Sequence, residues 1–328
     1  ETLIQIEAMA QLTDVFPLSC LTFHEKDGAR HEFRPMAEYL YNALPFFFPN
    51  GQDENMNTYG HLTVSNTVKD VVEHEAFAGF GQFILPAERR YDDDMPLTNV
   101  ASLLPYHNYV TGERAVETIN TMIDYVHEGN RLFYDIYSDA DKQADSRKNN
   151  TGLFFFRGEP GRPFAIVCPG GGFSYVGAIH EGFPLAIALS RMGYNAFSIQ
   201  YRTGGAQVAC EDLAQAINFI MRHAEELQVS TEDYSLWGGS AGARMAAYLG
   251  SYSTQGFIDA THERPAAVIM GYTGHSEYTQ NDPPTYVIIG EDDAIANPAT
   301  MRRRVENLQA LGIDAEFHLL PDLRHGFG

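Results

Sequence analysis

Cysteine and lysine are scarce in this chain of 328 residues, which contains three cysteines (Cys20, Cys168 and Cys210) and four lysines. An odd and sparse set of cysteines does not support a disulfide framework. Cys168 lies in a continuous apolar run, where a thiol usually packs as a small hydrophobic group. We therefore expect neither a disulfide-stabilised fold nor a thiol nucleophile.

Long apolar runs and a leader sequence are also lacking. No stretch of 18 or more apolar residues is present, so no transmembrane helix is expected. The first residues, Glu1-Thr-Leu-Ile-Gln-Ile-Glu7, have neither the basic n-region nor the apolar h-region of a signal peptide, which favours a cytoplasmic location. The first residue is not methionine, so a secreted form from which a leader has been removed stays open as an alternative.

Positive charge is in short supply, because 22 Lys and Arg residues face 43 Asp and Glu residues and the net charge is −21. Binding to phosphate groups requires basic patches. Nucleic acids and anionic membrane surfaces are therefore not expected as partners. An apolar share of 44% with 20% charged residues is that of an ordinary globular protein.

Residues 1–128 contain no motif that indicates catalysis, and we expect them to form a largely helical N-terminal extension that could act as a cap. Helices are expected over 35–44, 67–77 and 112–126. Two aromatic stretches, 39–48 and 77–83, are expected to pack against the following domain, with a lid over an acyl pocket as the alternative. Residues 129–328 are expected to form the catalytic domain.

From residue 129 onward, expected strands alternate with expected helices. Strands are expected over 131–137, 152–156, 164–168, 195–201, 236–237, 267–270, 285–289 and 315–320, and helices over 183–192, 211–227 and 298–311. The polar stretch 139–145 lacks the Gly and Glu that a calcium loop needs, so it is expected to be a solvated turn. This alternation predicts an α/β fold with a mostly parallel sheet and helices on both faces. Functional groups of such sheets gather at the carboxyl ends of the strands.

A turn motif, Gly238-Gly-Ser-Ala-Gly242, follows the short apolar run Leu236-Trp237 and precedes small residues that favour a helix. This G-x-S-x-G pattern would place Ser240 at the apex of a sharp strand-to-helix turn, where a nucleophilic serine stands. Glycines at positions 238 and 242 remove β-carbons that would clash there. The start of the helix would direct free N–H groups toward the reacting atoms. We therefore predict that Ser240 is a nucleophile.

A second glycine-rich motif, Pro169-Gly-Gly-Gly-Phe173, directly follows the expected strand 164–168. It has neither the G-x-G-x-x-G spacing nor the G-K-[ST] ending of phosphate-binding loops. Acyl transfer requires preorganised N–H donors that stabilise an oxyanion. We predict that the N–H groups of Gly171, Gly172 and Ala241 form this oxyanion hole.

The general base is expected among the histidines that follow Ser240, because a serine hydroxyl needs an imidazole to take its proton. These histidines are His262, His275, His318 and His325. His318 falls inside the last expected strand, whereas His325 follows that strand in a loop at its carboxyl end. We therefore predict that His325 is the base. His180, near the glycine-rich loop, is expected to be structural, with a contact to substrate as the alternative.

An acidic residue must orient the imidazole and offset its developing charge. Three carboxylates in a row, Glu291, Asp292 and Asp293, follow the expected strand 285–289 and lie between Ser240 and His325 in the chain. The spacing on either side accommodates an intervening strand–helix unit. These residues alone do not select one carboxylate among the three.

Together these motifs resemble the α/β-hydrolase superfamily, which uses the chain order Ser…Asp…His. The resemblance covers about residues 130–328. Within that superfamily, the motifs resemble those of small bacterial carboxylesterases, the acetyl-esterase and acetylxylan-esterase-like enzymes related to hormone-sensitive lipase. The motifs that carry this resemblance are Pro169-Gly-Gly-Gly-Phe173, Asn195-Ala-Phe-Ser-Ile-Gln-Tyr-Arg202, Gly238-Gly-Ser-Ala-Gly242, Gly290-Glu-Asp-Asp293 and His325-Gly-Phe-Gly328. In that group the acid is the fourth residue of a G-x-x-D pattern, so the resemblance implies Asp293 rather than Asp292.

The resemblance implies hydrolysis of short-chain, acetyl-like carboxylic esters through an acyl-enzyme, with Ser240, Asp293 and His325 as the catalytic residues. A small-molecule ester is the expected partner, and no metal or organic cofactor is implied. A serine peptidase of the prolyl-oligopeptidase type and a non-catalytic binding protein are the alternatives. Two departures from the group are Pro169, where many relatives have His, and Gly239, where Asp or Glu is common.

Overall fold

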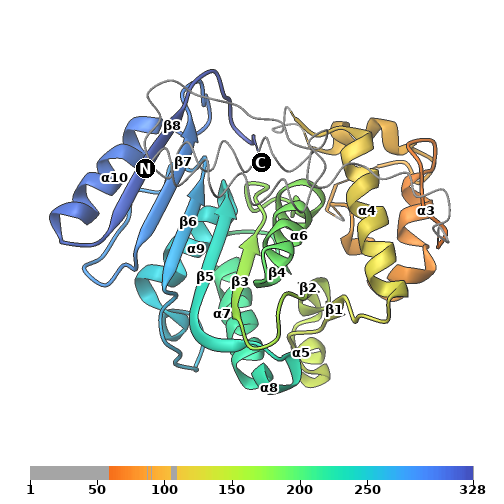
Figure 1. Ribbon diagram of the computed structural model, residues 1–328, viewed down its shortest axis with the longest axis horizontal. Coiled ribbons are helices and arrows are strands. Elements are labelled where there is room, and N and C mark those ends of the chain that lie inside the picture. The colour runs from red at the N-terminus through yellow and green to blue at the C-terminus, as the bar shows by residue number, and fades with distance from the viewer. Residues whose placement is uncertain (1–58, 87, 90, 105–108, 328) are drawn as a thin grey trace, which may run out of the picture. The chain divides into compact units, whose positions relative to one another are not determined.

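An eight-stranded sheet with the strand order β1-β2-β4-β3-β5-β6-β7-β8 is the centre of the fold (Figure 1). The computed structural model describes residues 59–86, 88–89, 91–104 and 109–327. The strands are β1 (Phe133–Tyr134), β2 (Gly152–Phe156), β3 (Pro163–Cys168), β4 (Asn195–Gln200), β5 (Ser230–Gly239), β6 (Ala267–Gly271), β7 (Thr285–Gly290) and β8 (Ala315–Leu320). Strand β2 pairs antiparallel with β1 and β4, and the pairs from β4 to β8 are parallel.

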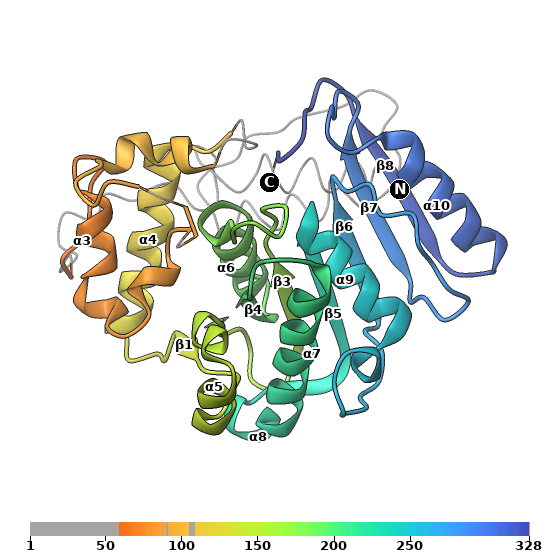
Figure 2. The same ribbon diagram turned by 180° about the vertical axis from the view of Figure 1, so that it is seen from behind.

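Helices cover both faces of this sheet. The α-helices of the described chain are α3 (Val68–Val72), α4 (Gly112–His127), α5 (Asp139–Ala144), α6 (Phe183–Arg191), α7 (Ala206–Arg222), α8 (Ala224–Leu227), α9 (Ala241–Tyr252) and α10 (Pro298–Ala310). The connections β4–α7–β5, β5–α9–β6 and β7–α10–β8 advance across the sheet in one direction, whereas β3–α6–β4 runs the other way. Because such crossovers are right-handed, α7, α9 and α10 lie on one face and α6 on the other (Figure 2). The predicted α/β fold with helices on both faces is confirmed.

Covered strands explain the apolar runs in the sequence. Every residue of β2 and β4 is buried, and in β3 only Pro163 is partly exposed. A strand that is buried on both faces carries apolar side chains continuously rather than in alternation. The apolar run that ends at Cys168 therefore forms strand β3, which crosses the core and ends at the carboxyl edge of the sheet. Among the described residues, no helix combines the length and apolar character that crossing a membrane requires.

Several expected elements differ from those observed because local side chains cap the backbone. The stretch 139–145, expected to be a solvated turn, contains helix α5, whose first turn is closed by reciprocal hydrogen bonds between Ser138 and Asp141. The helix expected over 67–77 stops at Val72, and the His74 side chain starts a separate 3₁₀ turn by accepting from the Ala76 N–H group.

Three further boundaries were wrong in extent. The helix expected over 211–227 begins earlier, at Ala206, and breaks at His223, which separates α7 from α8. The strand expected over 131–137 reduces to the two residues of β1. The strand expected over 236–237 extends over the ten residues of β5. The helix expected over 35–44 and the aromatic stretch 39–48 lie outside the described residues.

The described part of the N-terminal region packs on the β1–β2 side of the sheet, next to α6 (Figure 1). Phe80 stacks on Phe133 of β1 at 5.0 Å and meets Phe154 of β2 edge-on at 5.8 Å. The packing role expected for the aromatic stretch 77–83 is therefore confirmed, and the helix expected over 112–126 is α4. Residues 59–328 form one compact unit, and the predicted domain boundary between 128 and 129 stays a prediction.

Candidate active site

Ser240 occupies the turn between β5 and α9 in a strained backbone conformation. Its φ and ψ angles are 51° and −115°, a region that residues other than glycine rarely adopt. A β-carbon on Gly238 would lie 2.4 Å from the Gly242 carbonyl carbon, and one on Gly242 would lie 1.8 Å from the Cys168 carbonyl oxygen. Gly238 is therefore required for the start of α9 to pack against the end of β5, and Gly242 for it to pack against the end of β3, as the motif predicted.

A continuous chain of hydrogen bonds joins Ser240 to His325 and Asp293. The Nε2 atom of His325 lies 2.9 Å from the Ser240 hydroxyl oxygen, and its Nδ1 atom lies 2.8 Å from Oδ2 of Asp293. His325 follows β8 and Asp293 follows β7, so three strand ends at the carboxyl edge of the sheet supply the group. The structure thus brings together the three side chains for which catalytic roles were predicted.

Asp293, and not its neighbour Asp292, contacts the imidazole. Asp293 is 8% exposed, and its Oδ1 atom accepts hydrogen bonds from the N–H groups of Ile295 (2.9 Å) and Ala296 (2.7 Å). Asp292 is exposed to solvent. The backbone donors fix the Asp293 carboxylate in the orientation that its bond to His325 requires.

The other histidines after Ser240 have different environments. His318 lies in β8 beside Glu316, with 2.8 Å between Nε2 and Oε2, and His262 bonds to Asn218. His275 is buried, and this burial, with repulsion from Arg304 and Arg244, lowers its pKa to about 3. Of these four histidines, His325 is the one that forms a hydrogen bond with Ser240.

The glycine-rich loop lies directly against Ser240 and turns its peptide groups in a defined way. A β-carbon on Gly170 would lie 3.0 Å from the Ser240 β-carbon. The Gly170 carbonyl accepts from the Gly177 N–H group, and the Gly171 carbonyl accepts from the Ser174 N–H group, each at 3.0 Å. In a trans peptide the N–H group points opposite to the carbonyl.

The N–H groups of Gly171 and Gly172 therefore point away from residues 174–177, and they donate no hydrogen bond to other described residues. The backbone at both glycines has positive φ, 132° and 62°, which glycine adopts without strain. Ala241 is the first residue of α9, where an N–H group has no acceptor within the helix. All three predicted donors thus have N–H groups that are available to a ligand.

Glu181 is a residue of this site that the sequence motifs did not identify. It is 5% exposed, and its carboxylate accepts hydrogen bonds from the Gly170 N–H group and, at 3.0 Å, from the Tyr272 hydroxyl. Burial raises the pKa of Glu181 to about 7, although both hydrogen bonds oppose this rise. The signal in the sequence was a carboxylate in the largely apolar stretch 176–187, next to His180, which packs against Gly177.

Tyr272 occupies the space that a side chain at position 239 would need. A β-carbon on Gly239 would lie 2.5 Å from the Tyr272 hydroxyl oxygen and 2.8 Å from its ring. The same ring meets the His325 imidazole edge-on, with 5.3 Å between centroids. Because Gly239 has no side chain, the Tyr272 ring has space to form an aromatic wall beside His325.

Metal-binding clusters are absent from the described residues, in which no group of three or more His, Cys, Asp and Glu side chains is arranged to hold an ion. The two described cysteines, Cys168 and Cys210, are buried and free. Burial raises the pKa of both thiols, which disfavours a thiolate nucleophile. Cys20 lies outside the described residues.

Residues 158–269, which contain β3 to β5 and Ser240, match the family model BD-FAE. An acetyl ester-xyloside bifunctional hydrolase from Caldicellulosiruptor lactoaceticus is similar in structure, with a TM-score of 0.53 and 20% identity over 59% of this chain and 87% of that one. The chain therefore has the α/β-hydrolase fold.

Two further solved structures align with this chain at lower TM-scores. MGS-M1 from a Medee basin deep-sea metagenome has a TM-score of 0.48 and 24% identity, over 54% of this chain and 78% of that one. An esterase from Thermogutta terrifontis with bound propionate has a TM-score of 0.47 and 18% identity, over 54% and 80%. No curated protein sequence gives a significant match.

Proposed function

We propose that this protein is a serine carboxylesterase that hydrolyses short-chain, acetyl-like carboxylic esters. The observation that carries the proposal is the hydrogen-bonded chain from Ser240 through His325 to Asp293 at the start of α9. A serine hydroxyl becomes nucleophilic when an oriented imidazole takes its proton. The site supplies the serine, the imidazole and the carboxylate that orients it.

In the acylation step, Ser240 Oγ bonds to the ester carbonyl carbon while its proton moves to Nε2 of His325. The carbonyl oxygen becomes an oxyanion, which accepts hydrogen bonds from the N–H groups of Gly171, Gly172 and Ala241. Asp293 stabilises the imidazolium through Nδ1. The bond to the alcohol oxygen then breaks, and His325 protonates the departing alcohol.

In deacylation, water takes the place of the alcohol. His325 removes a proton from the water, whose oxygen attacks the acyl-enzyme carbonyl, and the second oxyanion is held by the same N–H groups. When the bond to Ser240 breaks, His325 returns the proton to Oγ and the carboxylic acid leaves. The cycle needs no oxidant, reductant or metal.

The test is hydrolysis of p-nitrophenyl esters with acyl chains from two to twelve carbons, with Ser240→Ala measured beside the wild type. We expect activity that falls steeply beyond short acyl chains and a loss of at least about 10⁴-fold in kcat for Ser240→Ala. Ser190→Ala, on helix α6, is the matched control and should retain wild-type rates. Acetylated xylosides belong in the panel because the Caldicellulosiruptor hydrolase is described as acting on an acetyl ester.

Equal activity in Ser240→Ala and the wild type would overturn the proposed nucleophile. Hydrolysis of peptides but not esters would favour a prolyl-oligopeptidase-type peptidase. Failure of the wild type on both substrate classes, together with no labelling of Ser240 by a fluorophosphonate, would favour a binding protein with a hydrolase fold.

A further inference from the structure

The buried carboxylate of Glu181 lies between two parts of the site that are distant in sequence. One of its oxygens faces the glycine-rich loop, 11 residues earlier, and the other faces Tyr272, 91 residues later. A buried carboxylate is costly unless it is hydrogen-bonded, and both oxygens of Glu181 are. The free-energy cost of burying this carboxylate indicates that it has a role at this position.

A π-helical turn, Ala178–Gly182, delivers Glu181 to this position. Such turns are rare and occur frequently at functional sites. Gly182 permits the close approach, because a β-carbon there would lie 2.3 Å from the Ser198 hydroxyl and 2.9 Å from the Pro169 ring. The backbone departs from regular helix in the turn that carries the carboxylate.

The first contact of Glu181 fixes the peptide group that precedes the predicted oxyanion donors. The carbonyl of the Pro169–Gly170 peptide accepts a hydrogen bond from the Tyr201 hydroxyl at 2.8 Å, and its N–H group donates to Glu181. This peptide plane is therefore held at both ends. Because the loop continues directly into Gly171, a rotation of this plane would re-aim the Gly171 N–H group.

The second contact of Glu181, with the Tyr272 hydroxyl, fixes the aromatic ring that lies beside the predicted base, His325. The Tyr272 hydroxyl donates to the other oxygen of Glu181 at 3.0 Å, and the Tyr272 ring meets the His325 imidazole edge-on. Tyr272 itself has a positive φ of 34°, which is unfavourable for a residue with a β-carbon. The bond to Glu181 helps to hold the ring in place against this preference.

We propose that Glu181 is a positioning residue for ester hydrolysis, which holds the oxyanion loop and the Tyr272 wall of His325 in one arrangement. The inference rests on the proposed esterase function. Because an oxyanion exists only after Ser240 attacks, the contribution of Glu181 belongs to kcat more than to KM.

The experiment compares Glu181→Ala, Glu181→Gln and Tyr272→Phe with the wild type, and with Glu159→Ala as an exposed-carboxylate control. For Glu181→Ala we expect kcat to fall about 100-fold, as for the loss of an oxyanion donor, with KM within about threefold of the wild type. Glutamine keeps an acceptor for the Gly170 N–H group and a polar group for Tyr272, so Glu181→Gln should recover most of this loss. Tyr272→Phe, which removes only one contact, should lower kcat by about three- to tenfold.

Affinity for a trifluoromethyl ketone separates positioning from general damage to the fold. Its adduct with Ser240 carries an oxyanion, so the inhibition constant should rise in parallel with the fall in kcat. Circular dichroism and thermal unfolding establish that each variant is folded. If Glu181→Ala does not fold, the test uses Glu181→Gln and Tyr272→Phe. The proposal is then supported if kcat falls more in Tyr272→Phe than in Glu181→Gln, and if the inhibition constant of Tyr272→Phe rises in parallel.

Wild-type values of kcat and inhibitor affinity in Tyr272→Phe, or in a folded Glu181→Ala, would overturn the positioning role while leaving the esterase function intact. The fluorophosphonate labelling rate of Ser240 gives a readout that does not depend on the choice of ester. A wild type that neither hydrolyses esters nor becomes labelled would overturn the esterase function, and the role of Glu181 with it.

Discussion

Asp292 and Asp293 are adjacent in the chain, yet only Asp293 bonds to His325. We expect Asp293→Asn to lower kcat by about 10⁴-fold, because an amide at this place favours the wrong imidazole tautomer and does not stabilise the imidazolium. Asp292 is exposed, so Asp292→Asn should stay within about twofold of the wild type. Ester hydrolysis at saturating substrate measures both variants.

Asp292→Asn is the matched control, since it removes the same charge one residue away. A comparable loss of kcat in the two variants would contradict the assignment of Asp293. Thermal unfolding of each variant distinguishes lost chemistry from a lost fold.

Single residues of this site differ in how visible they are in the sequence. Ser240 was visible because the turn around it requires glycine two positions before and two positions after it, and His325 because few histidines follow the nucleophile. Glu181 was not visible, because its partners lie 11 and 91 residues away and a pattern along the chain records only near neighbours. The choice between Asp292 and Asp293 required the family pattern.

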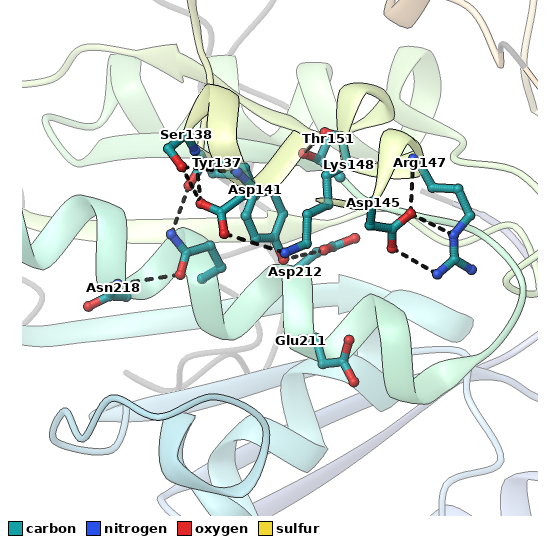
Figure 3. A network of polar contacts seen from close by, with 12 residues as sticks. Tyr137, Ser138, Asp141, Asp145, Arg147, Lys148, Thr151, Glu211, Asp212 and Asn218 are labelled. Atoms are coloured by element: carbon teal, nitrogen blue, oxygen red, sulfur yellow. Dashed lines mark hydrogen bonds and ion pairs between the residues drawn. The ribbon is translucent and has the colours of Figure 1, made fainter. Parts of the chain in front are cut away.

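At the scale of elements, Arg202 joins the end of β4 to α7 and to the turn that follows α5. Its guanidinium bonds to Asp212 at 2.8 Å, to Asp145 at 3.1 Å and to Glu211 at 3.2 Å. The Tyr137 hydroxyl donates to the same Asp212 at 2.7 Å. Figure 3 shows the segment 137–151 lying over the helix that carries Glu211 and Asp212. Arg202 is 6% exposed and Asp212 is fully buried.

Removing Arg202 should therefore destabilise the protein strongly. We expect Arg202→Ala to lower the free energy of unfolding by about 3–5 kcal/mol, because it leaves the Asp212 carboxylate buried without its charged partner. Arg147 also bonds to Asp145 but is mostly exposed, so Arg147→Ala should change stability by less than about 1 kcal/mol. Denaturant unfolding measures both, and equal effects of the two substitutions would contradict this account of the network.

The elements themselves were predictable where apolar periodicity was strong, as for α4, β3 and β7. The misses occurred where capping side chains outweigh periodicity. Helix α5 has no buried residue, so no apolar periodicity in the sequence indicates it. The reciprocal hydrogen bonds of Ser138 and Asp141 stabilise its first turn instead. At the end of α7, the His223 ring bonds to the Phe219 carbonyl at 2.8 Å, where the pattern alone predicted a continuous helix.

At the scale of the whole molecule, acid stability should depend on His275. Burial depresses its pKa in the folded state to about 3, whereas in the unfolded chain it titrates near 6.5. Its stabilising contribution is therefore complete above pH 6.5 and is lost as the pH falls toward 3. The groups that act on it are Arg304 and Arg244, which lower this pKa, and Asp282, which raises it.

We expect His275→Phe, which keeps a ring against Tyr248, to lose less stability than the wild type on acidification. Between pH 7 and pH 4 the difference in unfolding free energy between the two proteins should shift by about 3 kcal/mol in favour of the variant. Urea unfolding across this range measures the shift, and His318→Gln, at a partly exposed position of β8, is the control. Parallel pH profiles for wild type and His275→Phe would refute the depressed pKa.

The stack of Phe80 on Phe133 and Phe154 also bears on how such a protein changes in evolution. These rings come from both sides of residue 129 and share one apolar core. Residues that share a core unfold together, so a loss on one side is felt on the other. The described residues between 59 and 128 are thus expected to unfold together with the sheet. They do not form an interchangeable module, and an insertion at this junction is expected to destabilise both sides of it.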